Sequence, residues 1–228
     1  RIMKYFLLTI FMSLIFFSTE KLFSQENNKK AVEILDKMSS FYKKMESFSS
    51  TFQYSMVNLD ENIEDSFKGK IIIKDDKYVL TIEGQEIIND GKTVWTYLPE
   101  LNEVNISSYE PDDQEISLNN VFDLYKNGYN HNYVGEDSKH HIIELYPLDE
   151  TRSYYKIKIL IKKHDSSMFN FSVFDRSNTK YVYTINQFKV EKYFDDFVAF
   201  DFEKYPDIEI VDFELSEFTN IYRAIDKY

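Results

Sequence analysis

Cysteine is absent from this sequence of 228 residues, and its absence excludes several kinds of chemistry. Without cysteine the protein has no disulfide bonds, no cysteine nucleophile and no thiolate ligand for a metal ion. It also has no cysteine behind an export signal to which a lipid could be attached. We therefore expect an exported form of the chain to be soluble.

Glycine and proline are scarce, with five and four residues, whereas aromatic side chains make up 17% of the sequence. With so few glycines, the turns must rely on asparagine and aspartate, which accept tight backbone conformations. Aromatic and β-branched side chains fit the half-buried surface of a pleated sheet. The composition therefore predicts a mostly β protein.

Positive charge is also in short supply, because 27 lysines and arginines face 39 aspartates and glutamates, for a net charge of −12. A strongly acidic chain disfavours nucleic acid and anionic lipid headgroups as partners. The acidic charge has no effect on the binding of an apolar ligand held inside the protein. An apolar ligand is therefore compatible with the composition, and nucleic acid is not.

Residues 1–24 have the pattern of a cleaved export signal. Lys4 precedes an apolar run from Tyr5 to Phe17, and a more polar stretch follows as far as Ser24. The apolar run is shorter than the about 20 residues that a membrane-spanning helix needs. After cleavage, 24 basic and 38 acidic side chains would remain, a net charge of −14. An uncleaved N-terminal anchor is the alternative interpretation.

The spacing of apolar residues predicts two helices and a series of strands. Apolar residues recur at helical spacing from Ala31 to Met45 and again within Leu118–Lys126. Elsewhere the period is two, which is typical of antiparallel strands with one dry face. The strands predicted in this way are Thr51–Met56, Lys70–Lys74, Tyr78–Ile82, Thr93–Tyr97, Glu103–Ser107, Tyr129–Val134, His141–Tyr146, Tyr154–Lys162, Met168–Phe174 and Tyr181–Phe188.

These elements predict one domain over residues 25–213 and a short C-terminal tail over 214–228, because no repeat or linker divides the chain. A large twisted sheet of about ten or eleven strands tends to curl on itself. We therefore predict a mostly β (α+β) fold, in which a highly curved antiparallel sheet forms an unclosed β-barrel. The N-terminal helix and the inserted helix would cover it.

Residues suited to catalysis or metal binding are not grouped along the chain. His140 and His141 are adjacent, so on a strand they point to opposite faces and cannot bind one metal ion together. Paired carboxylates such as Asp75 and Asp76 lie in polar turns. Neither a serine nucleophile elbow nor a glycine-rich phosphate loop is present. We therefore expect no enzyme activity, no catalytic residue, no metal site and no cofactor.

A turn followed by a strand carries a resemblance to a known family. The chain reads Asp90-Gly91-Lys92-Thr93-Val94-Trp95-Thr96-Tyr97, with Pro99 after it. This segment resembles the Asp-Gly-Lys-Thr-hydrophobic-Trp-hydrophobic-Tyr motif of the LolA family of periplasmic outer-membrane lipoprotein carriers, from which only Thr96 departs. The resemblance covers about residues 29–213, because four more segments agree with the family in order: Phe48–Phe52, Gly69–Lys74, Ser117–Tyr125 and Phe200–Asp212. The segment Ser117–Tyr125 resembles the form found in Bacteroidetes-type members.

One feature of the best-known carriers of this family is missing. They have a lid-closing arginine in a turn after the second strand, and the corresponding residues here are Lys74, Asp75 and Asp76. The fold and the acyl binding that the resemblance implies do not depend on that arginine. A gating mechanism based on it cannot be transferred to this chain.

The resemblance implies a periplasmic carrier that holds the acyl chains of lipoproteins in an apolar cavity and moves them from the inner to the outer membrane. Its implied partners are acylated lipoproteins, an inner-membrane lipoprotein-releasing transporter and an outer-membrane acceptor. We expect a monomer. Two alternatives stay open: an envelope sensor or interaction domain on the same half-barrel, and a carrier of another lipid.

Inward-facing residues of the predicted strands and helices are the candidates for the acyl-binding site. Plain core packing is the alternative for each of them. The candidates for the cavity wall are Phe52, Tyr54, Ile71, Ile73, Tyr78, Leu80, Trp95, Tyr97, Tyr155, Ile157, Ile159 and Phe171. The candidates for a lid are Met38, Phe41 and Phe122.

Overall fold

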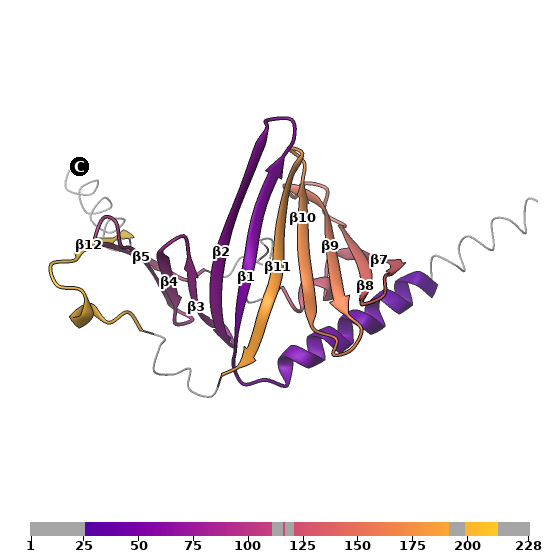
Figure 1. Ribbon diagram of the computed structural model, residues 1–228, viewed down its shortest axis with the longest axis horizontal. Coiled ribbons are helices and arrows are strands. Elements are labelled where there is room, and N and C mark those ends of the chain that lie inside the picture. The colour runs from indigo at the N-terminus through magenta and orange to yellow at the C-terminus, as the bar shows by residue number, and fades with distance from the viewer. Residues whose placement is uncertain (1–25, 111–115, 117–120, 192–198, 214–228) are drawn as a thin grey trace, which may run out of the picture.

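The chain folds into a single curved sheet of twelve strands, which the computed structural model describes over residues 26–110, 116, 121–191 and 199–213 (Figure 1). The strand order is β12-β6-β5-β4-β3-β2-β1-β11-β10-β9-β8-β7. Neighbouring strands are antiparallel except for β12 and β6, which run parallel. The sheet does not close into a barrel, since β12 and β7 form its two edges. The predicted fold class is confirmed; the predicted export signal and tail lie outside the described residues.

The predicted strands are found, most of them with nearly the predicted limits. Two strands, β4 and β12, are missing from the predicted series. In β4 the two adjacent isoleucines, Ile87 and Ile88, break the alternation. The twelve strands are β1 (Phe48–Asn58), β2 (Ile63–Lys74), β3 (Lys77–Ile82), β4 (Gln85–Asn89), β5 (Thr93–Leu98), β6 (Glu103–Ser108), β7 (Tyr129–Glu136), β8 (His140–Pro147), β9 (Tyr154–Lys162), β10 (Met168–Asp175), β11 (Thr179–Val190) and β12 (Glu209–Asp212).

Asparagine and aspartate supply the turns, as the scarcity of glycine predicts. Asp75 takes a positive φ of 51° in the turn between β2 and β3. In the turn between β4 and β5, the side chain of Asn89 accepts a hydrogen bond from the backbone N–H of Gly91 at 2.6 Å. The carboxylate of Asp90 accepts from the N–H groups of Lys92 and Thr93, both at 2.8 Å. These short polar side chains replace backbone partners that the turn leaves unpaired.

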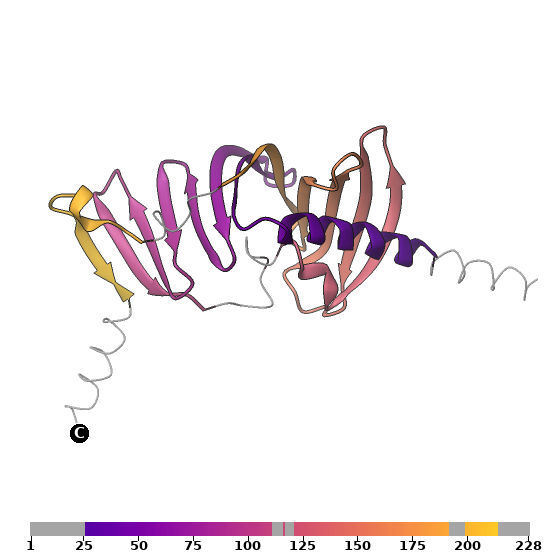
Figure 2. The ribbon, with the colours of Figure 1, turned by 90° about the horizontal axis from the view of Figure 1, so that it is seen from below.

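The N-terminal helix is described over residues 26–43 and packs against one face of the sheet. Ala31, Leu35 and Met38 are completely buried, and they share a hydrophobic core with residues of β8, β9 and β10. Figure 2 shows the helix lying across this half of the sheet. We call the face that carries the helix the inner face, and the opposite one the outer face.

The second predicted helix, Leu118–Lys126, is wrong for the residues that the structure describes there. Residues 121–123 form a turn, and only Leu124–Lys126 form a single turn of 3-10 helix, η1. Residues 117–120 lie outside the described part of the chain. The segment is too short and too rich in asparagine and aspartate to support an α-helix by itself.

Asp123 joins this segment to the N-terminal helix. Its carboxylate accepts a hydrogen bond from the Ser39 hydroxyl at 2.6 Å and forms ion pairs with Lys43 at 2.7 Å and Lys126 at 2.6 Å. Partial burial by itself would raise the pKa of Asp123. The hydrogen bonds from Lys126, Lys43 and Ser39 outweigh it and lower the pKa to about 2.

We predict that Asp123→Asn lowers the free energy of unfolding at neutral pH and flattens its dependence on acid pH. Because the pKa of Asp123 is depressed in the folded protein, its contribution is present above the unfolded pKa of about 4. That contribution is lost as the pH falls through about 2. Urea unfolding between these pH values measures the effect, with the exposed Glu100→Gln as control. If the free energy of unfolding had the same slope against pH in wild type and in Asp123→Asn, the depressed pKa assigned to Asp123 would be contradicted.

Candidate acyl-binding site

The inner face contains an apolar cavity of about 480 Å³ beside the C-terminal end of the helix. Strands β1, β2, β3, β10 and β11 form most of its wall, and Ile116, Val121 and Phe122 also border it. Ser50 and Ser153 are the serines in the lining. The residues around the cavity are Tyr42, Phe48, Ser50, Phe52, Tyr54, Ile71, Ile73, Leu80, Ile82, Ile116, Val121, Phe122, Ser153, Tyr154, Met168, Phe171, Val173, Tyr181, Tyr183, Ile185 and Phe188.

Strand register brings the wall residues together. Tyr54 pairs with Tyr183 across β1 and β11, and Tyr183 pairs with Phe171 across β11 and β10. On the other side, Ile71 pairs with Leu80 across β2 and β3. Paired residues of neighbouring strands point to the same face, so these side chains form one continuous apolar surface.

Gly69 gives the ring of Phe52 its place in the wall. The two residues pair across β1 and β2, and a Cβ atom added to Gly69 would lie 2.4 Å from Cζ of Phe52. No real side chain tolerates such a contact without a shift of its neighbour. The absence of a side chain at Gly69 therefore leaves room for the tip of the Phe52 ring over β2, beside the cavity that the residue lines.

Aromatic rings line the cavity toward the far ends of β1 and β11. The ring centroid of Tyr54 lies 5.0 Å from that of Tyr183, 6.0 Å from that of Phe67 and 6.4 Å from that of Tyr181. Burial raises the pKa of Tyr183 to about 12, so its hydroxyl stays neutral at all physiological pH values. This part of the wall is therefore aromatic and uncharged.

Another aromatic group bounds the cavity where the helix ends. The rings of Tyr42 and Phe122 stack with centroids 3.8 Å apart, and Phe48 lies 5.1 Å from Phe188. The hydroxyl of Tyr42 accepts a hydrogen bond from the backbone N–H of Met168 at 3.0 Å. This hydrogen bond of Tyr42 connects the end of the helix to β10, next to the cavity.

A polar group lies directly behind the wall at Tyr154. The hydroxyls of Tyr154 and Tyr129 are 2.5 Å apart, and the guanidinium of Arg152 donates to both of them, at 2.9 Å for Tyr129. Burial raises the pKa of Tyr129, and so does its hydrogen bond with Tyr154. The cluster satisfies these hydroxyls away from the cavity, which leaves the ring of Tyr154 as an apolar lining.

The structure brings seven of the predicted site residues to the cavity: Phe52, Tyr54, Ile71, Ile73, Leu80, Phe171 and, from the predicted lid, Phe122. Ile157, Ile159 and Met38 are completely buried in the core with the helix and do not line the open space. Tyr78 and Phe41 are partly buried against the same core. Phe41 contacts Phe188, whose ring does line the cavity.

Trp95 and Tyr97 lie on the outer face, so their predicted inward position is wrong. Trp95 pairs with Ile88, Ile88 with Val79, and Val79 with Ile72, which is the outward neighbour of Ile71 and Ile73. The aromatic side chains of β5 have a separate apolar cover, made by Phe200, Tyr205 and Ile208. Tyr97 stands 4.3 Å from Tyr205 between ring centroids. The motif that carries the family resemblance therefore supports a second core.

Tyr155 also faces outward and is 43% exposed, contrary to its predicted place in the wall. The register between β9 and β10 shifts here, because Phe174 pairs with Lys156 while Asp175 pairs with Tyr154. Tyr155 is thus the extra residue of a β-bulge. A bulge reverses the alternation of the strand, so the inward position falls to Tyr154.

Several wall residues were not predicted although their strands were. Tyr181, Tyr183 and Ile185 alternate along β11 and line the cavity, as does Phe48 on β1. Their alternation with polar neighbours is the signal that marks them. What the sequence does not show is which inward residues lie under the helix and which lie beside it.

The chemistry of the lining suits an apolar ligand. Among the residues that the structure describes, no cluster of three histidines or carboxylates could hold a metal ion. In the same part of the chain, no helix has both the length and the apolar character needed to cross a membrane. The described lining is apolar and aromatic apart from Ser50 and Ser153, and such a lining is suited to a hydrocarbon chain.

Comparisons with known proteins agree with this geometry. The model of the family described as "Outer membrane lipoprotein carrier protein LolA" matches residues 43–203. Solved structures with a similar fold include an uncharacterized conserved protein from Thermus thermophilus, at 14% identity and a TM-score of 0.54, covering 80% of this chain and 99% of that one.

Two further structures resemble the chain less closely. A LolA superfamily protein from Nitrosomonas europaea has 14% identity and a TM-score of 0.42, with 75% of this chain and 98% of that one covered. The lipoprotein LppX from Mycobacterium tuberculosis has 10% identity and a TM-score of 0.45, with 73% and 98% covered. No match was found among curated proteins. Since the family model spans more than half of the sequence, the chain belongs to the LolA family.

Proposed function

We propose that this protein is a carrier that binds the acyl chains of lipoproteins in the inner-face cavity and shuttles them across the periplasm, from the inner to the outer membrane. The observation that carries the proposal is the cavity itself, about 480 Å³ of space with an apolar and aromatic lining in a member of the LolA family. Ligand-binding cavities in proteins have volumes of roughly 300–1,000 Å³.

The energetics of acyl chains explain why such a carrier is needed. A palmitoyl-sized chain has about 15 methylenes, each worth roughly 0.8 kcal/mol when buried, so its exposure to water costs about 12 kcal/mol. An acylated protein cannot cross an aqueous compartment against that cost without cover. The wall from Phe48 to Tyr54 on β1 and from Tyr181 to Phe188 on β11 offers it. No bond is made or broken, so the role requires no enzyme activity.

The partners follow from the direction of transport. An inner-membrane lipoprotein-releasing transporter would load the cavity, and an outer-membrane acceptor would empty it. The export-signal pattern of residues 1–24 supports a periplasmic location. Because no bond has to break, loading and release require only that each partner compete with the cavity for the same chains.

We predict that Ile185→Asp abolishes lipoprotein binding while Val182→Asp does not. Both residues are on β11, but Ile185 lines the cavity and Val182 pairs outward with Ser55. A carboxylate inside the cavity would have to be desolvated beside the acyl chain, which is strongly unfavourable. The carrier is purified in its exported form and added to spheroplasts that contain labelled lipoproteins. The released lipoproteins are measured, and native mass spectrometry identifies the species bound to the carrier.

Three results separate the possibilities. A bound triacylated lipoprotein that is lost in Ile185→Asp and kept in Val182→Asp supports the proposal. A different lipid in the cavity, with no release of lipoproteins, would make the protein a carrier of another cargo. A protein with an empty cavity that releases nothing would contradict carriage altogether and favour an interaction domain.

We predict that Gly69→Ala weakens acyl binding by reducing the space in the cavity. The added methyl group would displace the Phe52 ring, and we expect the ring to move into the cavity that it lines. Overpacking of this kind costs typically 1–3 kcal/mol of stability, about the size of effect expected in unfolding experiments. In Gly69→Ala/Phe52→Leu the smaller side chain should restore binding. An unaltered affinity in Gly69→Ala would show that the ring has room elsewhere.

A further inference from the structure

The outer face of the central strands has a charge opposite to that of the whole chain. Strand register assigns the outward positions of six neighbouring strands, β3, β2, β1, β11, β10 and β9. Glu64 is the one carboxylate at these positions. The outward lysines are Lys68, Lys70, Lys74, Lys77, Lys156, Lys158, Lys162, Lys180 and Lys189. We call this surface the lysine face; it belongs to a chain with a net charge of −12.

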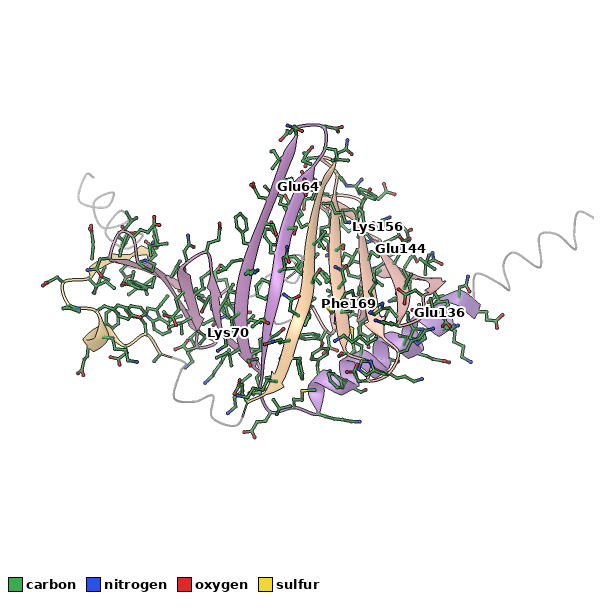
Figure 3. All side chains as sticks on the ribbon, viewed as in Figure 1. Glu64, Lys70, Glu136, Glu144, Lys156 and Phe169 are labelled. Carbon is green, nitrogen blue, oxygen red and sulfur yellow. The ribbon has the colours of Figure 1, made fainter. Side chains whose placement is uncertain are left out.

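Most of the lysines stand on two sides of a largely polar belt on β1, β11 and β10, and Lys180 and Lys189 lie near the two ends of β11. Figure 3 labels Lys70 on β2 and Lys156 on β9, with β1, β11 and β10 between these two strands. Hydroxyl and amide groups of the belt bond to one another, as from Gln53 to Ser66 at 2.8 Å and from Asn170 to Thr184 at 3.0 Å. The belt therefore repels no anion.

The ammonium groups are held at the surface. Lys68, Lys70 and Lys180 are exposed. The ammonium of Lys156 lies 4.3 Å from the ring centroid of Phe174, and that of Lys180 lies 5.6 Å from the same ring. Lys156 also pairs with Glu144 of β8 at 3.3 Å, which neutralises part of its charge. Lys74 pairs in the same way with Glu46 at 3.7 Å, and Lys189 with Glu191 at 3.4 Å. The positive field thus comes mainly from exposed lysines such as Lys68, Lys70 and Lys180.

We propose that the lysine face docks on the surface of an anionic phospholipid bilayer. Lys68 and Lys70 border an open hollow together with Thr51 and Thr81, but the lysines as a set are spread over several strands. A protein partner is usually bound through a compact cluster of aromatic and arginine anchors. A bilayer with anionic headgroups attracts basic side chains one by one, with similar contributions from each. Although the net charge of the chain disfavours anionic lipids, the fold concentrates its lysines on one face.

Docking in this orientation leaves the cavity unobstructed, because the helix and the cavity lie on the inner face. It would also be reversible, since ionic attraction without apolar insertion weakens steeply with salt. The docking depends on surface charge and not on the cargo. Vesicle binding and lipoprotein release can therefore succeed or fail separately.

The test is sedimentation of the full-length exported protein with vesicles of phosphatidylglycerol and phosphatidylcholine, and with vesicles of phosphatidylcholine alone. We expect binding to the anionic vesicles only, and weaker binding at about 0.15 M salt than at low salt. The test variant is Lys68→Gln/Lys70→Gln/Lys180→Gln. Its partition coefficient on anionic vesicles should be about 100-fold lower than that of wild type, because each lysine contributes a factor of about five. The control Lys29→Gln/Lys37→Gln/Lys44→Gln removes the same charge from exposed residues elsewhere.

Binding to anionic vesicles that the first variant loses and the control keeps supports the proposal. An equal loss in both variants would overturn it, because net charge and not the lysine face would then control binding. The proposal would also be overturned if the wild-type protein, shown to be folded by a cooperative thermal unfolding transition, did not bind anionic vesicles at low salt. Binding to an acidic peptide such as polyglutamate, without binding to vesicles, would assign the face to a protein partner instead.

Discussion

The pairing of β1 with both β2 and β11 decides on which side of the sheet the other side chains lie. In one continuous ladder of strands, the face of each residue follows from the face of its partner. Phe52 and Tyr54 point to the inner face, and Thr51 and Gln53 point to the outer one. A slip by one residue would exchange the two sets. The cavity and the lysine face therefore arise from the same alternation.

That alternation explains how much the sequence could predict. Strands with a clear alternation of letters, such as β3, β6 and β9, are predicted to within one residue of the observed limits. Tyr155 was misplaced because a bulge adds a residue without changing the pattern of letters. Trp95 and Tyr97 were misplaced because an aromatic row normally marks the buried face of a sheet. Here the cover on the outer face comes from residues around Phe200, a contact that the local sequence does not reveal.

The distinction between core and cavity depends on where the helix lies. Ile157 and Leu80 both face inward, yet one is completely buried in the core that includes the helix and the other borders open space. The stacked rings of Tyr42 and Phe122 mark the boundary between the two regions. Hydrophobic periodicity identifies the face of a strand, but the reach of a helix across that face is a property of the tertiary structure. For this reason the site was predicted only in part.

The pairing of β1 with β11 has a consequence for how the protein folds. Strands β1–β6 form one meander and β7–β11 another, and each can pair locally along the chain. The two are joined where Ser50 pairs with Phe188, a contact between distant parts of the sequence. Such contacts form late because the entropy of closing a long loop must be overcome first. A chain that emerges N-terminus first would therefore expose the unpaired edge of β1, beside its apolar inner face, until β11 arrives. During that interval the exposed edge and the apolar surface next to it make the chain prone to aggregation.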